Sequence, residues 1–465
     1  MLEEINPAKK KNYTIPIVIM FSLFFMIAFV TGYQNPLGSV IEKMSSGNTF
    51  MSQLGTLANF IAYAFMGYPA GRRLQKSGYR VTALWAVTIG FIGVAVTYFS
   101  GFIGTDSFRN LLFGLTNGVT YFSGFIGTDS TAVTVYIIGA FIAGFSMCLL
   151  NTVVNPMLNS LGSTPNQGNQ LVQFGGTFNS LGATLAPVIV GGLLGGEAST
   201  IASANPVFYL AMGIFAVAFI VLYFSKLPES PDLGKKQEKV KVGGAFKYIN
   251  FTFGVLAIFC YVGLEVGMAN WTYQYLQKHT LVAEANAGFE AAAIAGTVCG
   301  MYWLLMLVGR FIGGLVGGKI SSRVMLIIAS VGVMALIIAG IFTNEDMVGF
   351  IGFSSKNLEF STVSIPMNAI YFVLCGLFAS IMWGAIFNLS VTGLGKYTAV
   401  ASGIFMVMVC GGGIFPFIQS SIAETNLLSS FWLDFGLAAY IFIYALVLSI
   451  PSKNLPEKQE VLVED

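Results

Sequence analysis

The chain has 465 residues, of which 55% are hydrophobic and 9% are charged, and its net charge is +2. Soluble domains carry about 25% charged residues, so this composition indicates a membrane protein. The single histidine and five apolar-embedded cysteines supply neither a catalytic triad nor a metal site, so we expect no enzyme activity and no cofactor. The net charge gives no reason to expect a nucleic-acid partner.

Apolar stretches long enough to cross a bilayer occur throughout the chain. We expect an all-α membrane protein with twelve transmembrane helices, the first of them retained because it has no small-residue cleavage pattern. The predicted spans are residues 17–39, 52–71, 81–100, 134–158, 174–195, 205–225, 248–275, 291–317, 321–342, 367–394, 400–422 and 430–450.

The first span contains the string GYQNPLGSV, in which Gln34 and Asn35 precede Pro36. Proline frees a backbone carbonyl and bends a helix, so we expect a break here that exposes polar groups near the membrane middle. The two amides are candidate substrate ligands. The alternative is a tolerated kink whose amides bond to neighbouring helices.

The second span is followed by the basic string GYPAGRRLQKSGYR at residues 67–80, which we expect to form a turn. Its Arg72 and Arg73 are candidate gating or structural residues. A rough counterpart, GRFIGGLVGGKISSR at 309–323, begins with Arg310, another such candidate. Matching basic segments suggest two parallel six-helix repeats, although any cytoplasmic loop attracts lysine and arginine.

The string VTYFSGFIGTDS occurs at 96–107 and again at 119–130, which indicates a tandem duplication. A thirteenth span would invert the topology of everything that follows, against the distribution of basic residues. We therefore interpret residues 101–133 as an enlarged outer loop with no function of its own.

The fourth and fifth spans place four amides inside apolar sequence, at Asn151, Asn155, Gln173 and Asn179. An unpartnered amide in hydrocarbon costs several kcal/mol, so these side chains should face other helices, a water-filled cavity or a polar ligand. Interhelical hydrogen bonding explains any one of them, but four together favour a substrate path. Close helix packing or sliding is expected at Gly175, Gly176, Gly182, Gly191 and Gly192.

Glu265, near the middle of the seventh span, is the candidate for proton coupling. A carboxylate in a membrane is costly unless it is paired, hydrated or protonated. The alternative is a structural pair with Arg310, but that residue is expected toward the inner end of the eighth span, which argues against the pair. Asp434 is expected to reach the outer interface.

Aromatic and amide side chains in the second half complete the predicted binding site. Sugar rings stack on aromatic planes, and their hydroxyls need the donors and acceptors of amides. Aromatic residues near span ends are alternatively interface anchors. The candidates are Asn270, Trp271, Tyr302, Trp383 and Asn388.

Residues 226–247 form the only long polar stretch inside the chain. We interpret them as a cytoplasmic linker between an N-terminal half (1–225) and a C-terminal half with its polar tail (248–465). The linker is either a tether or an amphipathic helix on the membrane surface. With both termini in the cytoplasm, the only lysines and arginines in the outer loops are Lys43, Arg109, Lys278 and Lys356. This distribution agrees with the positive-inside rule.

Several strings together resemble one family, the fucose, galactose and glucose proton symporters of the major facilitator superfamily. The similarity runs through most of the twelve spans. The resemblance implies a monosaccharide carrier that alternates between inward-open and outward-open states. The strings are NTVVNPMLNSLG, TFNSLGATLAP, YVGLEV, GRFIG and GLFASIMWGAIFNLSVTGLGKYTAVASGIFMVMVCGGGIFPFIQ.

The chain also departs from that family. Acidic residues associated with proton coupling usually stand where this chain has Asn35 and Asn151, and a family glutamine falls at Gly176. Asn155, Asn179 and Glu265 match the common pattern. The departures concern the energy source more than the substrate class.

We therefore predict a monomeric, multi-pass carrier in a bacterial inner membrane that imports a hexose or 6-deoxyhexose such as glucose, galactose or fucose with a proton. The alternatives are an uncoupled facilitator, a sodium-coupled carrier and, more distantly, a sugar sensor that does not transport.

Overall fold

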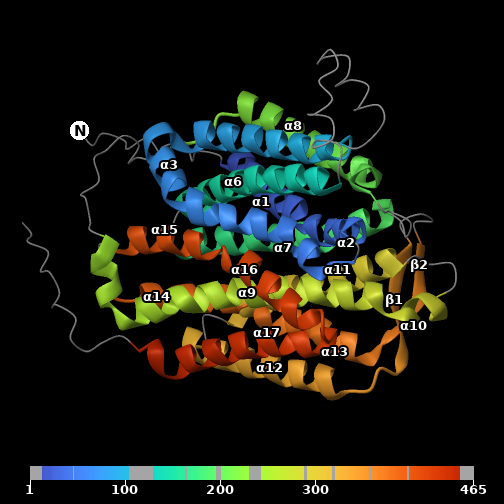
Figure 1. Cartoon of the computed structure of the whole chain (residues 1–465). Helices are drawn as coiled ribbons and strands as arrows, with labels where there is room; N and C mark the ends of the chain where they lie inside the picture. The colour runs from blue at the N-terminus through green and yellow to red at the C-terminus, as the bar shows by residue number, and fades with distance from the viewer. Residues whose placement is uncertain are drawn as a thin grey trace, which may run out of the picture.

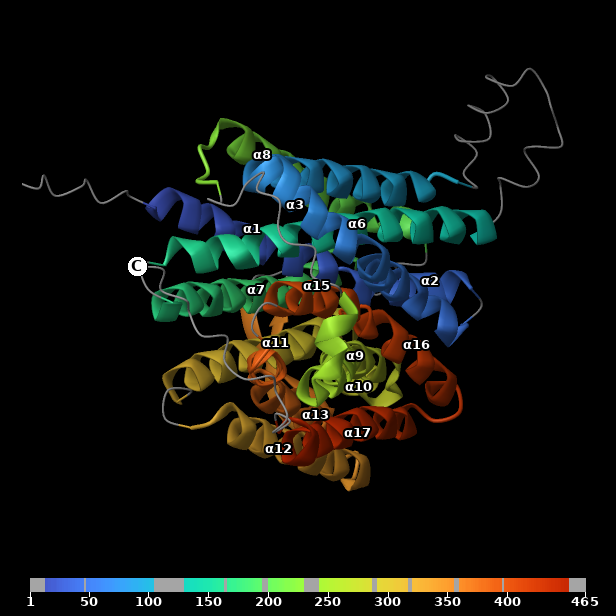
Figure 2. The same ribbon diagram turned by 90° about the vertical axis from the view of Figure 1, so that its left-hand side faces the viewer.

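The computed structural model describes residues 13–45, 47–103, 129–162, 165–194, 200–229, 242–286, 291–316, 320–354, 359–394 and 397–450. Within these ranges the regular structure is helical except for one two-stranded hairpin. The helices of the first 224 residues lie above those of residues 249–450 in Figure 1. In both Figure 1 and Figure 2, α15 lies between the two groups.

The first group of helices begins with a broken span. An interruption occurs at the predicted place, because α1 ends at Gly32 and α2 begins at Gln34, with Tyr33 between them and Pro36 in the first turn of α2, but it leaves Gln34 buried and bonded to Tyr136, as the tolerated-kink alternative has it. The elements of this group are α1 (Thr14–Gly32), α2 (Gln34–Met44), α3 (Thr49–Ser100), α6 (Asp129–Leu161), α7 (Pro165–Leu194), η1 (Ile201–Ala204) and α8 (Asn205–Phe224).

Helix α3 covers the predicted second and third spans, and the turn predicted over residues 67–80 lies within that range but is confined to Gly78. Only Gly78 leaves the helical conformation, at φ 78° and ψ 177°, a region that glycine adopts without the steric cost of a side chain. The helix therefore continues through Arg72 and Arg73 before it kinks. Pro69 also lies within it; an interior proline removes a hydrogen bond and clashes with the preceding turn, a cost that membrane helices tolerate where neighbouring groups satisfy the freed backbone.

Glu229 caps the helix that restarts after the kink. Its carboxylate accepts hydrogen bonds from the backbone N–H groups of Tyr79 at 2.6 Å and Arg80 at 3.2 Å. An acidic side chain at a helix N-terminus satisfies free N–H groups and complements the helix dipole.

The second group contains two further broken spans. The predicted spans 367–394 and 400–422 are each divided, at Ser380–Ile381 and at Val409–Cys410. The elements are η2 (Val242–Lys247), α9 (Ile249–Lys278), α10 (Thr280–Ala285), α11 (Ala291–Val316), α12 (Ser322–Phe342), β1 (Met347–Ser354), β2 (Glu359–Pro366), α13 (Met367–Ala379), α14 (Met382–Val391), α15 (Thr398–Met408), α16 (Gly411–Ala423), α17 (Leu427–Ile443) and the π-helical η4 (Tyr444–Leu448).

The hairpin of β1 and β2 was not predicted. The strands are antiparallel, with Phe350 opposite Val363. Val363 and Ile365 are buried, whereas Phe360 is 73% exposed, so the strand has an inner and an outer face. We call the end of the bundle with the hairpin and α10 the hairpin end, and the opposite end, where α1 begins and η4 finishes, the terminal end (Figure 1).

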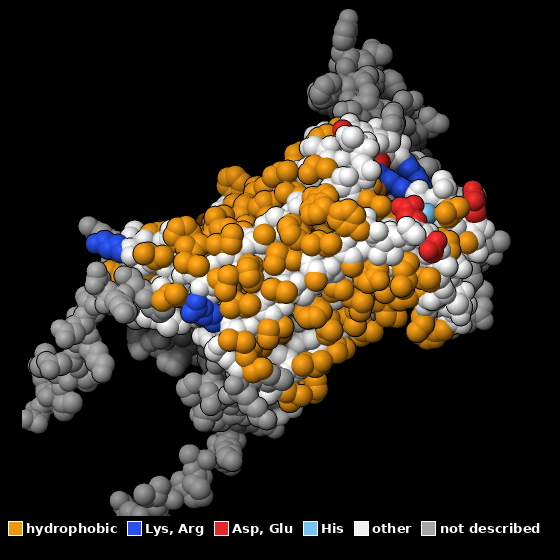
Figure 3. Space-filling view, turned by 90° about the horizontal axis from the view of Figure 1, so that it is seen from below, with side chains coloured by type: hydrophobic (Ala, Val, Ile, Leu, Met, Phe, Trp, Pro, Cys, Tyr) orange, Lys and Arg blue, Asp and Glu red, His pale blue; other side chains and the backbone are white. Residues whose placement is uncertain are grey.

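The described residues contain eleven helices long and apolar enough to cross a membrane. The predicted span 52–71 forms the first part of α3 but is less apolar, because it carries Gln53 and Asn59. Hydrophobic side chains cover the middle of the face in Figure 3, while most charged side chains lie at its two ends. The chain is a multi-pass membrane protein.

The buried hydrophobic residues form two clusters. One cluster contains residues of α1 to α8 and Leu227, and the other contains residues of η2 to η4 together with Phe60 of α3. The predicted glycine packing occurs on α7, where a Cβ added to Gly182 would collide with the backbone carbonyl of Phe25. Each cluster thus has its own core, with close helix contacts inside it.

In each group of helices, an arginine of an earlier helix donates hydrogen bonds to backbone carbonyls near the end of the last helix. Arg80 of α3 donates from Nε to the carbonyl of Leu222 and from a terminal nitrogen to that of Tyr223. Arg323 of α12 donates the same pair of bonds to Ala445 and Leu446. The last carbonyls of a helix have no partner within it, so each arginine closes the helix it contacts.

Three predicted features lie outside the described residues. They are most of the duplicated loop, within 104–128, the middle of the linker, 230–241, and the polar tail, 451–465.

Candidate functional site

Arg310 connects three helices from the two groups. Its Nη2 lies 3.1 Å from Oε1 of Glu265 on α9. Its Nη1 donates to the carbonyl of Gly176 at 3.0 Å and to Oγ of Ser180 at 2.7 Å, both on α7. The Arg310 and Glu265 side chains are 16% and 13% exposed. One guanidinium thus joins the intramembrane carboxylate to the opposite group of helices.

The expectation that Arg310 lies too far from Glu265 is wrong. Side chains on a helix point back toward its N-terminus, and α11 begins at the hairpin end. The long arginine side chain therefore reaches from its position on α11 toward the middle of α9. Pairing also lowers the cost of both charges in the membrane.

Aromatic side chains surround the Glu265 position. The hydroxyl of Tyr302 donates to the backbone carbonyl of Glu265 at 3.2 Å. Tyr261, one turn earlier on α9, lies with its ring centroid 6.1 Å from that of Trp383. Trp383 is partly exposed, whereas Tyr302 and Tyr261 are fully buried. Of the predicted aromatic ligands, Trp383 is the one whose ring is partly exposed and therefore accessible to a solute.

The predicted amides of α6 and α7 are partly exposed and are held through their nitrogen atoms. Nδ2 of Asn151 donates to the hydroxyl of Tyr63 at 3.0 Å, Nδ2 of Asn155 to the carbonyl of Asn151 at 2.9 Å, and Nδ2 of Asn179 to the carbonyl of Phe24 at 3.1 Å. Among the described residues, no hydrogen bond reaches the Oδ1 atoms of these three asparagines. Fixed amides with open acceptors suit the recognition of hydroxyl groups.

Other predicted ligands lie away from this centre. Gln34 is buried and accepts from the Tyr136 hydroxyl at 2.6 Å. Trp271 is buried and donates from Nε1 to the carbonyl of Pro416 at 3.2 Å. Asn388 is exposed at the terminal end and donates to Oγ of Ser322 at 2.9 Å. The side chains of Asn35 and Gln173 fall outside the described part of the structure.

The predicted gating arginines of α3 contact aromatic rings of the same helix. Arg72 lies 5.8 Å from the ring centre of Tyr68, and Arg73 lies 4.7 Å from that of Trp85. Such cation–π contacts stabilise a basic helix surface, and neither contact joins the two groups of helices.

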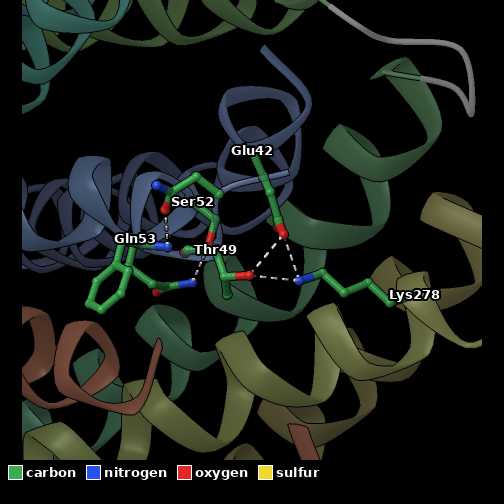
Figure 4. Close-up of polar contacts among 7 residues, drawn as sticks. Glu42, Thr49, Ser52, Gln53 and Lys278 are labelled. Atoms are coloured by element: carbon green, nitrogen blue, oxygen red, sulfur yellow. Dashed lines mark hydrogen bonds and ion pairs between the residues drawn. The ribbon is translucent and has the colours of Figure 1, made fainter. Parts of the chain in front are cut away.

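Sequence reasoning missed a polar cluster at the hairpin end, shown in Figure 4. Lys278 of α9 forms an ion pair with Glu42 of α2 at 2.7 Å, and Thr49 donates to the same carboxylate oxygen at 3.1 Å. In the same network, Nδ2 of Asn270 donates to Oε1 of Gln53 at 3.2 Å. The missed signal was the pair of opposite charges after the first and seventh spans.

Asp434 does not reach the interface, contrary to expectation. Its side chain is 1% exposed and accepts a hydrogen bond from Nε2 of Gln419 on α16 at 2.8 Å. Residue position along α17 was a poor guide, because α9, α12 and α16 all pack against this helix and cover it.

Comparisons with known proteins agree with this architecture. The sequence model of the Major Facilitator Superfamily matches residues 17–417. A "Glucose/galactose transporter" of Brucella abortus is 28% identical over 95% of both chains. The "L-fucose-proton symporter" of Escherichia coli is 21% identical over 97% of this chain and 96% of its own.

Solved structures share the fold. The crystal structure of the fucose:proton symporter of E. coli matches with a TM-score of 0.61 and 20% identity over 94% of this chain and 98% of that one. A partially occluded, inward-open xylose transporter from E. coli matches with a TM-score of 0.64 and 12% identity over 92% and 97%.

Proposed function

We propose that this chain, which belongs to the Major Facilitator Superfamily, imports a monosaccharide by alternating access together with a proton. The family consists of transporters, so the chain is a membrane transporter and not an enzyme. The names of its relatives support a hexose or 6-deoxyhexose such as glucose, galactose or fucose as the substrate.

The observation that carries the proposal is the position of Arg310 between Glu265 and α7. Protonation of Glu265 would remove the negative charge that holds one side of the guanidinium. Arg310 would then be free to change its contacts with Gly176 and Ser180 on the opposite group of helices. A proton bound at one helix would in this way alter the contact between the two groups.

The sugar would bind beside this centre. The open acceptors of Asn151, Asn155 and Asn179 suit hydroxyl groups, and the partly exposed ring of Trp383 suits the apolar face of a pyranose. Gln34 and Asn270 already have amide or hydroxyl partners, so they would bind sugar only after those bonds are exchanged.

The two moving parts would be residues 1–225 and 248–465, connected by a cytoplasmic linker at 226–247. Their separate hydrophobic clusters and the matching bonds of Arg80 and Arg323 support this division. The hairpin end would face outward and both termini inward, in the inner membrane of a bacterium. In the proposed mechanism a single chain contains the whole substrate path, so a monomer would suffice.

The proton would provide the driving force. A charge that crosses 100 mV changes its free energy by about 2.3 kcal/mol, so one proton at about 150 mV would sustain an accumulation of a few hundredfold. The amides at Asn35 and Asn151 leave Glu265 as the main candidate for this proton. An uncoupled facilitator is the second candidate, favoured by those same amides.

Purified protein in liposomes would test the proposal. Labelled glucose, galactose and fucose would be offered with an imposed proton gradient, with and without a protonophore. We expect accumulation of at least one sugar and its loss when the gradient collapses. Sugar entry without accumulation would support the facilitator, and accumulation that needs sodium would support a sodium-coupled carrier. Binding without counterflow would indicate a sensor and contradict transport.

A further inference from the structure

Asp434 is a buried carboxyl group away from the Glu265–Arg310 pair. The residue is 1% exposed, and Gln419, its hydrogen-bonding partner, is 0% exposed. Among the described residues, no lysine, arginine or histidine forms an ion pair with Asp434. Burial of an isolated carboxylate is strongly unfavourable, so something else must compensate its charge.

Two acceptor atoms next to each other lack a donor. Nε2 of Gln419 donates to Oδ2 of Asp434 at 2.8 Å, which occupies one oxygen of the carboxyl group. Oδ1 of Asp434 and Oε1 of Gln419 are both buried and have no partner among the described residues. A Cβ added to Gly267 of α9 would lie 2.7 Å from Oδ1 and 3.0 Å from Oε1, so both oxygens face the same glycine.

One proton would satisfy both atoms. A protonated carboxyl group has an O–H donor, and the side-chain carbonyl of glutamine is an acceptor. With the proton on Oδ1, the acid would donate to Oε1 of Gln419 while the amide donates to Oδ2. The two side chains would then form a closed acid–amide pair with two parallel hydrogen bonds and no net charge.

Among the described residues, the titratable side chains that interact electrostatically with Asp434 are Tyr302 of α11 and Cys375 of α13, whose ordinary forms near pH 7 are uncharged. Ser430 of α17 contacts Nε2 of Gln419 at 3.3 Å. The charged residue of α12, Arg323, is occupied with the carbonyls of Ala445 and Leu446 at the terminal end. On α9 the residue that faces Asp434 is Gly267.

We propose that Asp434 and Gln419 form a second proton-binding site, separate from Glu265, in which the bound proton bridges Oδ1 of Asp434 and Oε1 of Gln419. The site does not depend on the proposed sugar transport, because it concerns proton binding by the protein at rest. A sodium ion is the competing occupant, but it would need several more oxygen ligands than the two open atoms provide.

Infrared spectroscopy of the purified protein in lipid nanodiscs tests the site. We expect the carbonyl stretch of a protonated carboxylic acid near pH 7 in the wild type, its loss in Asp434→Asn, and its retention in the matched control Glu265→Gln. Absence of the band from the wild type, or its persistence in Asp434→Asn, would overturn the proposal.

Stability gives an independent measurement. Asparagine can replace the protonated acid with the same two hydrogen bonds, so Asp434→Asn should unfold at the wild-type temperature below about pH 4, where the unfolded wild type is also protonated, and at a higher temperature than the wild type near pH 7. Raising the pH should lower the wild-type unfolding temperature relative to that of the variant. Stabilisation of the wild type but not the variant by sodium would overturn the proposal in favour of a cation site. If Asp434→Asn does not fold, a shift of the acid band in Gln419→Leu would support the pair, and an unchanged band would contradict it.

Discussion

Glu42 and Lys278 are separated by 236 residues in the sequence, yet their side chains form an ion pair of 2.7 Å between α2 and α9. This pair and the Asn270–Gln53 hydrogen bond connect the two groups of helices at the hairpin end (Figure 4). Under alternating access, a pathway that opens at this end requires both contacts to separate. The cluster therefore stabilises the state in which the hairpin end is closed.

Neutralising the pair should favour opening at the hairpin end. Lys278 is 37% exposed, so the pair should contribute about 0.2–1 kcal/mol, and Lys278→Met should raise the open population by up to about fivefold. A cysteine at the buried position Ser52 would report opening through its reaction rate with a membrane-impermeant thiol reagent. The charge-swapped variant Glu42→Lys/Lys278→Glu should restore slow labelling. Equal rates in all three backgrounds would exclude the pair as a lock.

Removing Arg310 should destabilise the protein more than removing Glu265. Arg310→Met leaves a largely buried carboxylate without its cation, which should cost about 3 kcal/mol of unfolding free energy. Glu265→Gln leaves Arg310 without its anion but with its bonds to Gly176 and Ser180 and with the glutamine carbonyl as an acceptor, so it should cost less. Thermal unfolding in detergent would measure both, and the double variant should be more stable than Arg310→Met alone. Additive losses would show that the two charges do not interact.

The same glutamate should control coupling. In the liposome assay, Glu265→Gln should abolish proton-driven accumulation of sugar, because a glutamine side chain does not bind and release a proton near neutral pH. Counterflow of sugar, which needs no net proton movement, should continue. Normal accumulation by this variant would remove Glu265 from the coupling role.

Asn151 allows binding and packing to be separated. Its Nδ2 donates to the Tyr63 hydroxyl, and its side chain is partly exposed. Asn151→Ala should weaken sugar binding by roughly tenfold, the value of one or two hydrogen bonds. Tyr63→Phe removes the same internal bond but keeps the amide, so it should change affinity less. Similar effects of both variants on affinity would indicate that Asn151 only orients the helix.

Two glycines of α7 should respond differently to the same substitution. Gly182→Ala places a methyl group against the backbone of Phe25, which should cost about 1–3 kcal/mol of unfolding free energy. At Gly176 the nearest atom to an added Cβ is Nη1 of Arg310, at 4.0 Å, so Gly176→Ala should be neutral or stabilise by up to about 1 kcal/mol. Thermal unfolding would measure both. Equal destabilisation would contradict the difference in packing.

The sequence predicted the order of the spans and eleven of the twelve as membrane-crossing helices, because length and hydropathy depend on local composition alone. It located the break in the first span from Pro36, which acts on its own helix. The hairpin of β1 and β2 was missed because a hydropathy search does not test for alternation, although the buried Val363 and Ile365 alternate with the less buried Thr362 and Ser364. The turn predicted over residues 67–80 is present but shorter than expected, because only Gly78 requires a non-helical conformation.

The site was harder to predict because its contacts join distant segments. Glu265 was identified from its own position, whereas its pairing with Arg310 depends on how α9 and α11 lie and on the reach of one side chain. Burial of Asp434 likewise depends on the helices packed around α17. The sequence showed which polar residues are in the membrane, but their partners follow from tertiary packing.

Arg80 and Arg323 each bond to carbonyls within their own group of helices, and Glu229 bonds to Tyr79 within the first group. All three interactions would therefore survive a cut in the polypeptide between residues 230 and 241. Two separately expressed fragments should insert into the membrane and reassemble with one another, joined by contacts such as those of Arg310 with α7. Continuity of the peptide chain would then ensure that the two parts are made in equal amounts, and it would not be needed for their architecture.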